Sequence, residues 1–373
     1  MLSWILVALN FIWRLVAEMA SVQSLRRIEG LDSVRAIAAL SVVFAHLLGP
    51  SMPGVTKYIF TGHPAVIAFF VVSGFCIHYP YRQREMKALP FLAGRFLRIV
   101  PPTIVAFVLA QAVGIKAYNP VHGYILWSVV CEIIYYCLYP LILPLSRKLG
   151  WLPVIGISIG ASYAVAIGYG SDQYGNAQIY GPQLNWLVGL PAWLIGCYLA
   201  EQFDRLSIPG HLLLWRLVTA GTASILYWAT INTPVGFYLT MTPFAILAAC
   251  WMLSEINAAE KFGAVKLLEN IGAACFSIYL MHAVTATAVD KLVTTNPLLV
   301  CPLALALIYP FYQWIEKPSH AAARGIKKVL ATGSHAPEAP FLKDVEGETI
   351  EGLDTVSTYD ANAIPNGRKG SAA

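Results

Sequence analysis

The chain is a series of long apolar segments separated by short polar connections. Each apolar segment is about 18–24 residues long, the length that a helix needs to cross a hydrocarbon core of ~30 Å. Ten segments fit this pattern and are predicted to be membrane-spanning helices. They lie at 31–49, 62–80, 98–115, 121–143, 151–170, 183–200, 211–230, 236–254, 268–288 and 295–315. The predicted fold class is therefore all-α, a polytopic transmembrane helical bundle of about ten spans.

The composition points the same way. Of the 373 residues, 57% are hydrophobic and only 12% are charged, whereas a soluble domain carries about 25% charged residues. A soluble fold of this length could not hide so much apolar surface, because most of its exterior must face water. The lipid bilayer is therefore the expected surroundings of the chain.

Lysine and arginine residues gather on one side of the predicted spans. Counted over the termini and loops, sixteen fall on the side of both chain ends, and only Lys57, Lys116 and Lys291 fall on the other. Positive charge stays cytoplasmic, so both termini are predicted to face the cytoplasm, in a multi-pass protein of the cell inner or plasma membrane. The net charge of +5 is dispersed in short loops. It therefore indicates topology and not nucleic-acid binding.

The two ends of the chain differ from the predicted membrane region at 22–320. Residues 1–21 begin with an apolar stretch that is too short to span and is interrupted by Arg14 and Glu18. This extension is predicted to be an interfacial helix, and a later start at Met19 is an alternative. Residues 321–373 are predicted to be a disordered cytoplasmic tail, since the sequence there turns polar and loses its periodicity.

The seven cysteines all lie inside apolar segments, and none has the C-x-x-C spacing of a zinc site. They are expected to be free thiols that pack as small hydrophobic groups. No metal is predicted.

Four ionisable residues lie within the predicted spans, where such groups are costly and mark functional sites. They are Arg35, His46, Glu132 and His282. Arg35 and His46 are eleven residues apart, so a helix places them on one face, ~16 Å apart along its axis. Glu132 and His282 are expected at the depth of His46. Together these groups predict a buried polar site, and a proton or ion path without covalent chemistry is the alternative.

Arg95 and Arg98 lie one turn apart where a predicted helix enters from the cytoplasmic side. Guanidinium groups suit the oxygens of phosphate groups because they bind them in a bidentate manner. The pair is therefore a candidate phosphate-binding site. A plain topological anchor explains the same spacing equally well.

Six short motifs, in order along about residues 26–320, resemble the membrane-bound acyltransferase-3 family. The first holds an arginine and a histidine separated by ten residues, the third is an Arg-x-x-Arg motif, and the fourth keeps the Trp-Ser and Glu positions. The motifs are Gly30–Leu40 closed by His46, Phe69–Phe75, Arg95–Pro101, Trp127–Glu132 continuing to Tyr136 and Pro140, Ser277–His282, and Glu316–Pro318.

The resemblance implies transfer of an acyl group from a cytoplasmic acyl-CoA to a hydroxyl of a sugar or cell-envelope acceptor. Arg35, Arg95 and Arg98 would hold the coenzyme A phosphates. Acetyl-CoA is the default co-substrate, with succinyl and longer chains left open. The acceptor would be a carbohydrate, a lipid-linked sugar or a small metabolite.

Within that reaction, His46 is the expected general base, since histidine titrates near neutral pH. Glu132 is expected to orient His46. Ser73, Trp127, Ser128, Tyr136 and His282 are expected to support the acceptor site. A transporter or flippase of an envelope precursor is the rival interpretation, although no internal repeat of the kind common in transporters is evident. A non-catalytic scaffold would give no reason for the arginine–histidine pair.

Overall fold

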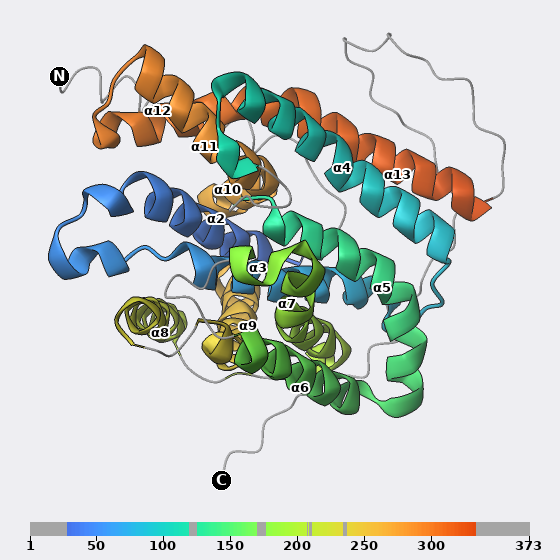
Figure 1. Ribbon diagram of the computed structural model, residues 1–373. Coiled ribbons are helices and arrows are strands. Elements are labelled where there is room, and N and C mark those ends of the chain that lie inside the picture. The colour runs from blue at the N-terminus through green and yellow to red at the C-terminus, as the bar shows by residue number, and fades with distance from the viewer. Residues whose placement is uncertain are drawn as a thin grey trace. The chain divides into compact units, whose positions relative to one another are not determined.

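The computed structural model describes residues 28–118, 125–169, 177–206, 208, 211–233 and 237–332. This part of the chain is helical and contains no strand (Figure 1). The predicted interfacial extension at 1–21 and residues 333–373 of the predicted tail lie outside the described residues.

Each of the ten predicted spans coincides with a helix or with two consecutive helices. The helices are α2 (Leu31–Leu47), α3 (Gly62–His78), α4 (Ala88–Val113), α5 (Trp127–Leu149), α6 (Trp151–Tyr169), α7 (Ala177–Glu201), α8 (Leu212–Asn232), α9 (Phe237–Phe262), α10 (Lys266–Ala273), α11 (Cys275–Leu292), α12 (Pro297–Phe311) and α13 (Lys317–Thr332). Helices form here because lipid offers no hydrogen-bond partner to the backbone.

Seven helices in the described residues are long and apolar enough to cross a membrane, or eight if α10 and α11 form one bent span. The chain is thus a multi-pass membrane protein. The other two predicted spans correspond to α2 and α7, which are not among those eight. With 17 residues, α2 is short for a membrane span. The predicted number of ten spans is therefore not confirmed by the described residues.

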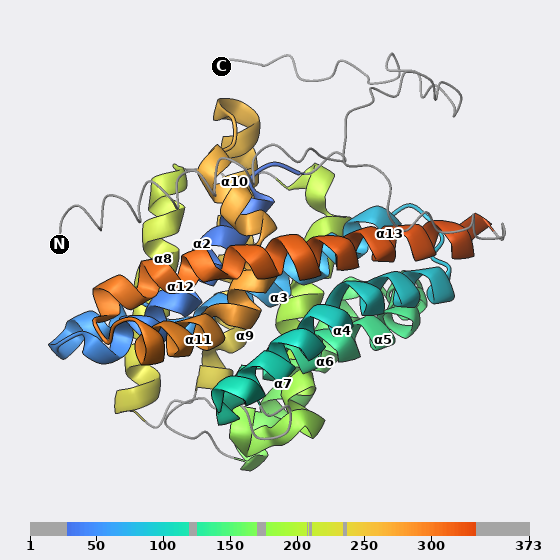
Figure 2. The same cartoon turned by 90° about the horizontal axis from the view of Figure 1, so that it is seen from above.

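The last helix corrects the predicted boundary of the tail. Residues from 321 onward were expected to be disordered, yet α13 continues to Thr332. It runs beside α4 in both views (Figure 1, Figure 2). Ala323 is buried in this contact, and Gly94 of α4 faces its backbone. One apolar face against α4 is enough to hold a helix whose other positions are polar.

Glycine residues allow the central helices to cross closely. A Cβ atom at Gly74 of α3 would overlap the carbonyl oxygen of Trp193 on α7, and one at Gly196 would overlap that of Val71. The two backbones therefore touch at this crossing. Small residues take this role in membrane proteins because close packing, and not hydrophobicity, drives helix association in lipid.

Two breaks shape the final third of the fold. The axes of α10 and α11 differ by 69° across Ala274. A π-helical turn at Tyr312–Glu316 separates α12 from α13. This turn brings the Glu316 carboxylate to the start of α11, where it accepts hydrogen bonds from the backbone N–H of Ser277 at 2.9 Å and from its hydroxyl. The break between α10 and α11 leaves backbone donors at the start of α11, and the π-helical turn supplies their acceptor.

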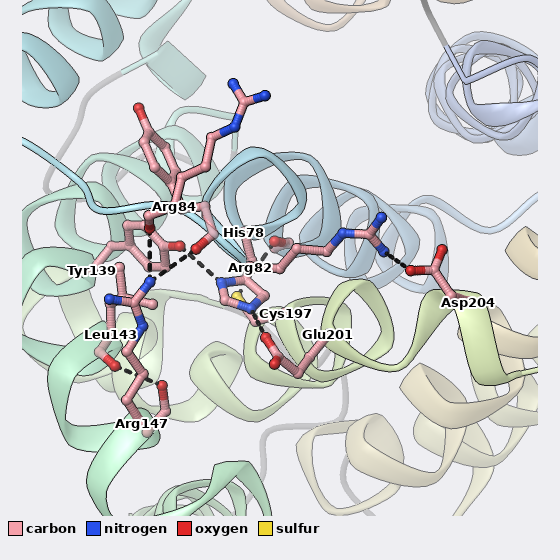
Figure 3. Close-up of polar contacts among 12 residues, drawn as sticks. His78, Arg82, Arg84, Tyr139, Leu143, Arg147, Cys197, Glu201 and Asp204 are labelled. Carbon is pink, nitrogen blue, oxygen red and sulfur yellow. Dashed lines mark hydrogen bonds and ion pairs between the residues drawn. The ribbon is translucent and has the colours of Figure 1, made fainter. Parts of the chain in front are cut away.

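A buried histidine joins three helices at the end of α3. Figure 3 shows the His78 ring between two polar partners. Its Nδ1 lies 2.8 Å from the Tyr139 hydroxyl of α5, and its Nε2 lies 2.6 Å from the Glu201 carboxylate of α7. The Arg147 guanidinium donates to the carbonyl oxygen of Arg84 at 2.7 Å. His78 is only 1% exposed, so these contacts hold the helix ends together.

Candidate active site

A basic groove lies among the start of α2, the first turns of α4, and α13. Its volume is about 470 Å³. Five cationic side chains line it against two carboxylates, those of Asp32 and Glu316. The cations are Arg35, Arg95, Arg98, Arg324 and Lys327. The excess of positive charge suits an anionic ligand.

The start of α2 fixes Arg35 in this groove. The Glu269 carboxylate of α10 accepts from the backbone N–H groups of Gly30 and Ser33 at 3.2 and 2.9 Å, and from the Ser33 hydroxyl at 2.7 Å. These bonds cap the helix in place of a local side chain. One turn on, the Arg35 guanidinium pairs with Asp32 at 2.6 Å and lies 3.1 Å from the Cys76 sulfur. Its position is therefore set from both α2 and α3.

Arg95 and Arg98 project from α4 one turn apart, as their spacing predicts. The Arg95 guanidinium lies over the rings of Phe91 and Tyr136, at 5.6 and 5.8 Å from their centroids. Such contacts orient a guanidinium without neutralising it. Arg98 is exposed in the structure. Both arginines can therefore offer donors to a ligand in the groove.

An inner cavity of about 160 Å³ adjoins the basic groove. Its polar lining comprises the arginines and five further side chains, while aliphatic and aromatic groups form the rest. Those five are Ser73, Ser128, Glu132, Tyr136 and Tyr279. Six residues line both spaces: Arg35, Cys76, Arg95, Arg98, Cys275 and Phe276. A ligand that enters the groove therefore meets the inner cavity directly behind the three arginines.

The structure places Glu132 differently from the sequence-based prediction. Its carboxylate accepts from the Ser73 hydroxyl of α3 and from the Tyr136 hydroxyl at 2.6 Å. The Trp193 indole N–H donates to the same serine oxygen at 3.2 Å. Glu132 therefore belongs to a hydroxyl network in the cavity wall. It does not orient His46, because its side-chain hydrogen bonds go elsewhere.

His46 is paired instead with His282 of α11. Nδ1 of His46 and Nε2 of His282 are 2.8 Å apart, and the rings are nearly parallel, with centroids at 5.0 Å. His282 is fully buried, whereas His46 is exposed. The two residues, which the sequence predicts at similar depth, are in contact, and His282 takes the place expected for Glu132.

The hydrogen bonds of His282 define the proton positions of the histidine pair. Its Nδ1 lies 2.7 Å from the carbonyl oxygen of Tyr279, which can only accept, so Nδ1 must carry the proton. In the neutral ring Nε2 is then an acceptor and receives the Nδ1–H of His46. Nε2 of His46 keeps its lone pair, and no hydrogen bond from the described residues occupies it. The pair can therefore accept a proton at this atom.

The histidine pair lies just beyond the inner cavity. On α3 the lining residues run from Ile77 back to Val66, and Gly62, one turn further in the same direction, faces His46. On α11 the last lining residue is Tyr279, one turn before His282. One turn corresponds to ~5 Å. Groove, cavity and histidine pair thus follow one another along α2, α3 and α11.

Seven of the ten sequence-predicted site residues line the inner cavity: Arg35, Ser73, Arg95, Arg98, Ser128, Glu132 and Tyr136. Trp127 does not line it, and its ring packs edge-on against Phe70 at 5.9 Å. His46 and His282 lie beyond it. The predicted polar site therefore consists of two adjacent groups of residues, the polar lining of the inner cavity and the histidine pair.

Sequence reasoning missed several residues of the groove. Arg324 and Lys327 fall in the predicted disordered tail, although their spacing of three is helical and indicates that they share a face. The ion pair of Arg216 with the buried Glu255, at 2.6 Å between α8 and α9, was also overlooked. It lines neither space and ties two helices together. Among the described residues, no three His, Cys, Asp or Glu side chains are grouped to hold a metal.

The helices and the enclosed polar site define a multi-pass membrane protein with a candidate catalytic centre between its helices. The family model described as "Acyltransferase domain" matches residues 28–313, most of the chain, and the protein belongs to this acyltransferase-3 family. No curated protein and no solved structure matches it. The matched region contains the inner cavity and the histidine pair, and it ends before Arg324 and Lys327 of the groove.

Proposed function

We propose that this acyltransferase moves an acyl group from a cytoplasmic acyl-CoA to a hydroxyl of a carbohydrate or lipid-linked sugar at the cell inner or plasma membrane. One observation carries the proposal above the others. The basic groove, the inner cavity and the histidine pair adjoin in that order along the same helices. An acyl-CoA has an anionic head, an extended arm and a reacting carbonyl, and these three spaces would receive them in that order.

The groove supplies the place for the anionic part of the donor. Arg35, Arg95 and Arg98 would bind the phosphate groups of coenzyme A, aided by Arg324 and Lys327. Lysine and arginine residues outside the spans favour a cytoplasmic position for this end of the helices. The arm that carries the thioester would then occupy the inner cavity.

The histidine pair supplies the acid–base chemistry. Nε2 of His46 takes the proton of the acceptor hydroxyl as the oxygen attacks the thioester carbonyl carbon. The tetrahedral intermediate then expels the thiolate of coenzyme A, and His46 returns the proton to that sulfur. The C–O bond forms, the C–S bond breaks, and the proton balance closes without another reactant. His282 holds His46 in the tautomer that this step needs.

The hydroxyl network around Glu132 has a positioning role. Glu132 fixes Ser73 and Tyr136 in the wall of the cavity, next to the arginines that meet the donor. Removal of the carboxylate would leave two hydroxyl groups without their acceptor. Its loss should therefore weaken the fit of the donor and leave the base intact.

The test measures release of free thiol from acetyl-CoA by the purified protein in lipid, with and without a cell-envelope extract as acceptor. His46→Ala should lower kcat by ~10²–10⁴-fold, the contribution of a positioned base. His211→Ala is the matched control, since this exposed histidine before α8 lies outside the site.

Release that requires both the extract and His46 would support acyl transfer. A folded His46→Ala protein with the turnover of the wild type would refute the role of His46. If no acyl-CoA released thiol from folded protein, acyl-CoA would not be the donor, and transport of an envelope precursor would become the better hypothesis.

A further inference from the structure

A separate pocket lies where α3, α5 and α7 end and α6 begins. Its volume is about 510 Å³, and small-ligand pockets usually measure ~300–1,000 Å³. It shares no lining residue with the basic groove or with the inner cavity. The proposed reaction therefore gives this pocket no role, and its lining has to be explained separately.

The wall of this pocket carries charges of both signs. Arg82, Arg147 and Glu201 line it together with the buried His78 (Figure 3). The Arg82 guanidinium pairs with Asp204, a largely exposed carboxylate, at 2.8 Å. Two arginines thus stand beside two carboxylates. A ligand that carries a negative and a positive group matches this wall better than a simple anion does, because complementary charges meet at both ends.

The charged groups keep hydrogen-bonding capacity for a ligand. Arg147 donates to the carbonyl oxygens of Tyr81 and Arg84 from Nη2, at 3.1 and 2.7 Å. Its guanidinium carries further N–H donors on Nη1 and Nε. Oε2 of Glu201 lies 2.6 Å from Nε2 of His78, and a carboxylate accepts through both of its oxygens. A phosphate at Arg147 and an ammonium group at Oε1 of Glu201 would therefore make charge-assisted hydrogen bonds.

The pocket lies beside a lipid-facing surface. Leu152 of α6 lines the pocket and is exposed. Leu141, Leu145 and Leu149 of α5 are exposed as well. Their spacing of four residues places them in one stripe along the helix, and this stripe ends next to Gly150, a lining residue. An acyl chain along the stripe would therefore bring its head group to the pocket.

The pocket also lies at the level expected for lipid head groups. Arg147 and Lys148 end α5 on the side that the distribution of positive charge predicts to be cytoplasmic. Trp151 begins α6 directly after them and lines the pocket. Tryptophan and basic residues mark the membrane interface. Basic pockets between helices on the cytoplasmic side bind phosphorylated head groups.

From these observations we infer that the pocket binds a phospholipid of the cytoplasmic leaflet that has a phosphoethanolamine head group. The phosphate lies against Arg82 and Arg147, the ammonium group donates to Glu201, and an acyl chain follows the leucine stripe of α5. The lipid joins the ends of α3, α5 and α7, and so supports the helices that carry Ser73 and Glu132. The inference goes beyond the proposed function and does not depend on it.

The experiment titrates the purified protein in detergent with three phospholipids of identical acyl chains and measures the bound lipid by native mass spectrometry. Phosphatidylethanolamine has the complete head group. Phosphatidylcholine has the same charges without ammonium N–H donors, and phosphatidylglycerol has no positive charge. Phosphatidylethanolamine should bind about tenfold more tightly than either, because only its head group donates a charged hydrogen bond to Glu201.

Two variants and a matched control assign the contacts. Glu201→Gln removes the charge and keeps an oxygen for His78, and it should reduce the preference for phosphatidylethanolamine over phosphatidylcholine to less than about threefold. Arg147→Gln should weaken binding of all three lipids by about tenfold. Lys148→Gln is the control, since this exposed neighbour does not line the pocket. It should leave the three affinities unchanged.

Equal binding of phosphatidylethanolamine and phosphatidylcholine by the wild type, or tighter binding of phosphatidylglycerol, would overturn the inference. An unchanged preference in folded Glu201→Gln would overturn it as well, and this result decides the test if Arg147→Gln does not fold. Glycerophosphoethanolamine carries the same head group without acyl chains. If it bound as tightly as the lipid, the ligand would be a soluble metabolite and the assignment to a phospholipid would be wrong.

Discussion

Replacement of His282 by leucine tests the assignment of roles within the histidine pair. Leucine fills the fully buried position with an apolar side chain, so the main chemical change is loss of the acceptor for Nδ1–H of His46. The ring of His46 is then free to rotate and to carry its proton on either nitrogen. The proposed general base, His46, remains present, but the nitrogen that would accept the proton is no longer specified.

The size of the effect follows from that one contact. In the proposed reaction His46 becomes positively charged when it takes the proton of the acceptor, so its 2.8 Å bond to His282 is then made by a charged donor. Hydrogen bonds to charged groups contribute about 1.5–3 kcal/mol, and each 1.36 kcal/mol changes a rate tenfold. His282→Leu should therefore lower kcat by about 10- to 150-fold, less than removal of His46 itself.

The assay is thiol release at saturating acetyl-CoA, with kcat and KM determined separately. KM for acetyl-CoA should change little, since His282 lines neither the groove nor the cavity. His282→Gln should recover part of the rate, because its amide oxygen can accept from His46. An unchanged kcat in folded His282→Leu, or a loss confined to KM, would refute the orienting role.

Three further predictions concern packing and binding. Gly74→Ala should lower the stability of the protein in detergent by about 1–3 kcal/mol, because its Cβ overlaps a backbone carbonyl of α7; Gly156→Ala, at an open position of α6, should show no loss in the same thermal melts. Arg98→Ala should raise KM for acetyl-CoA about tenfold or more with kcat preserved. Added salt should reduce the difference in KM between this variant and the wild type, because it screens the charge of Arg98. His78→Phe should lower stability by about 1–3 kcal/mol, since it leaves a buried hydroxyl unpaired, while KM for acetyl-CoA stays unchanged in folded protein.

The sequence predicts the helices well because each apolar segment carries its own signal. It also brings Arg35 and the Arg95–Arg98 pair to one place, since motif spacing and the positive-inside rule act locally. It could not predict which polar groups would meet. Glu132 lies 59 residues from Ser73, its actual partner, and His46 lies 236 residues from His282. A helix that is apolar on all sides does not reveal which face turns toward which neighbour.

The failure at the end of the chain has a different cause. The sequence of α13 is too polar for a span, and the surface that its apolar face covers is apparent only from the packing against Gly94 of α4. The contact between α13 and α4 places Arg324 and Lys327 at the groove. The apolar segment at 31–49 is likewise longer than the helix it predicts, because α2 ends at Leu47.

The link between Glu316 and the start of α11 has a consequence for how the protein is made. The ninth predicted span leaves the ribosome with a break whose backbone donors need a partner, and that partner is 39 residues further along the chain. The start of α11 is therefore synthesised before Glu316, the residue that accepts its hydrogen bonds. Until the π-helical turn after α12 arrives, His282 lies on a helix whose first turn is unsatisfied. Synthesis of the final span therefore completes the hydrogen bonding at the start of the helix that carries His282.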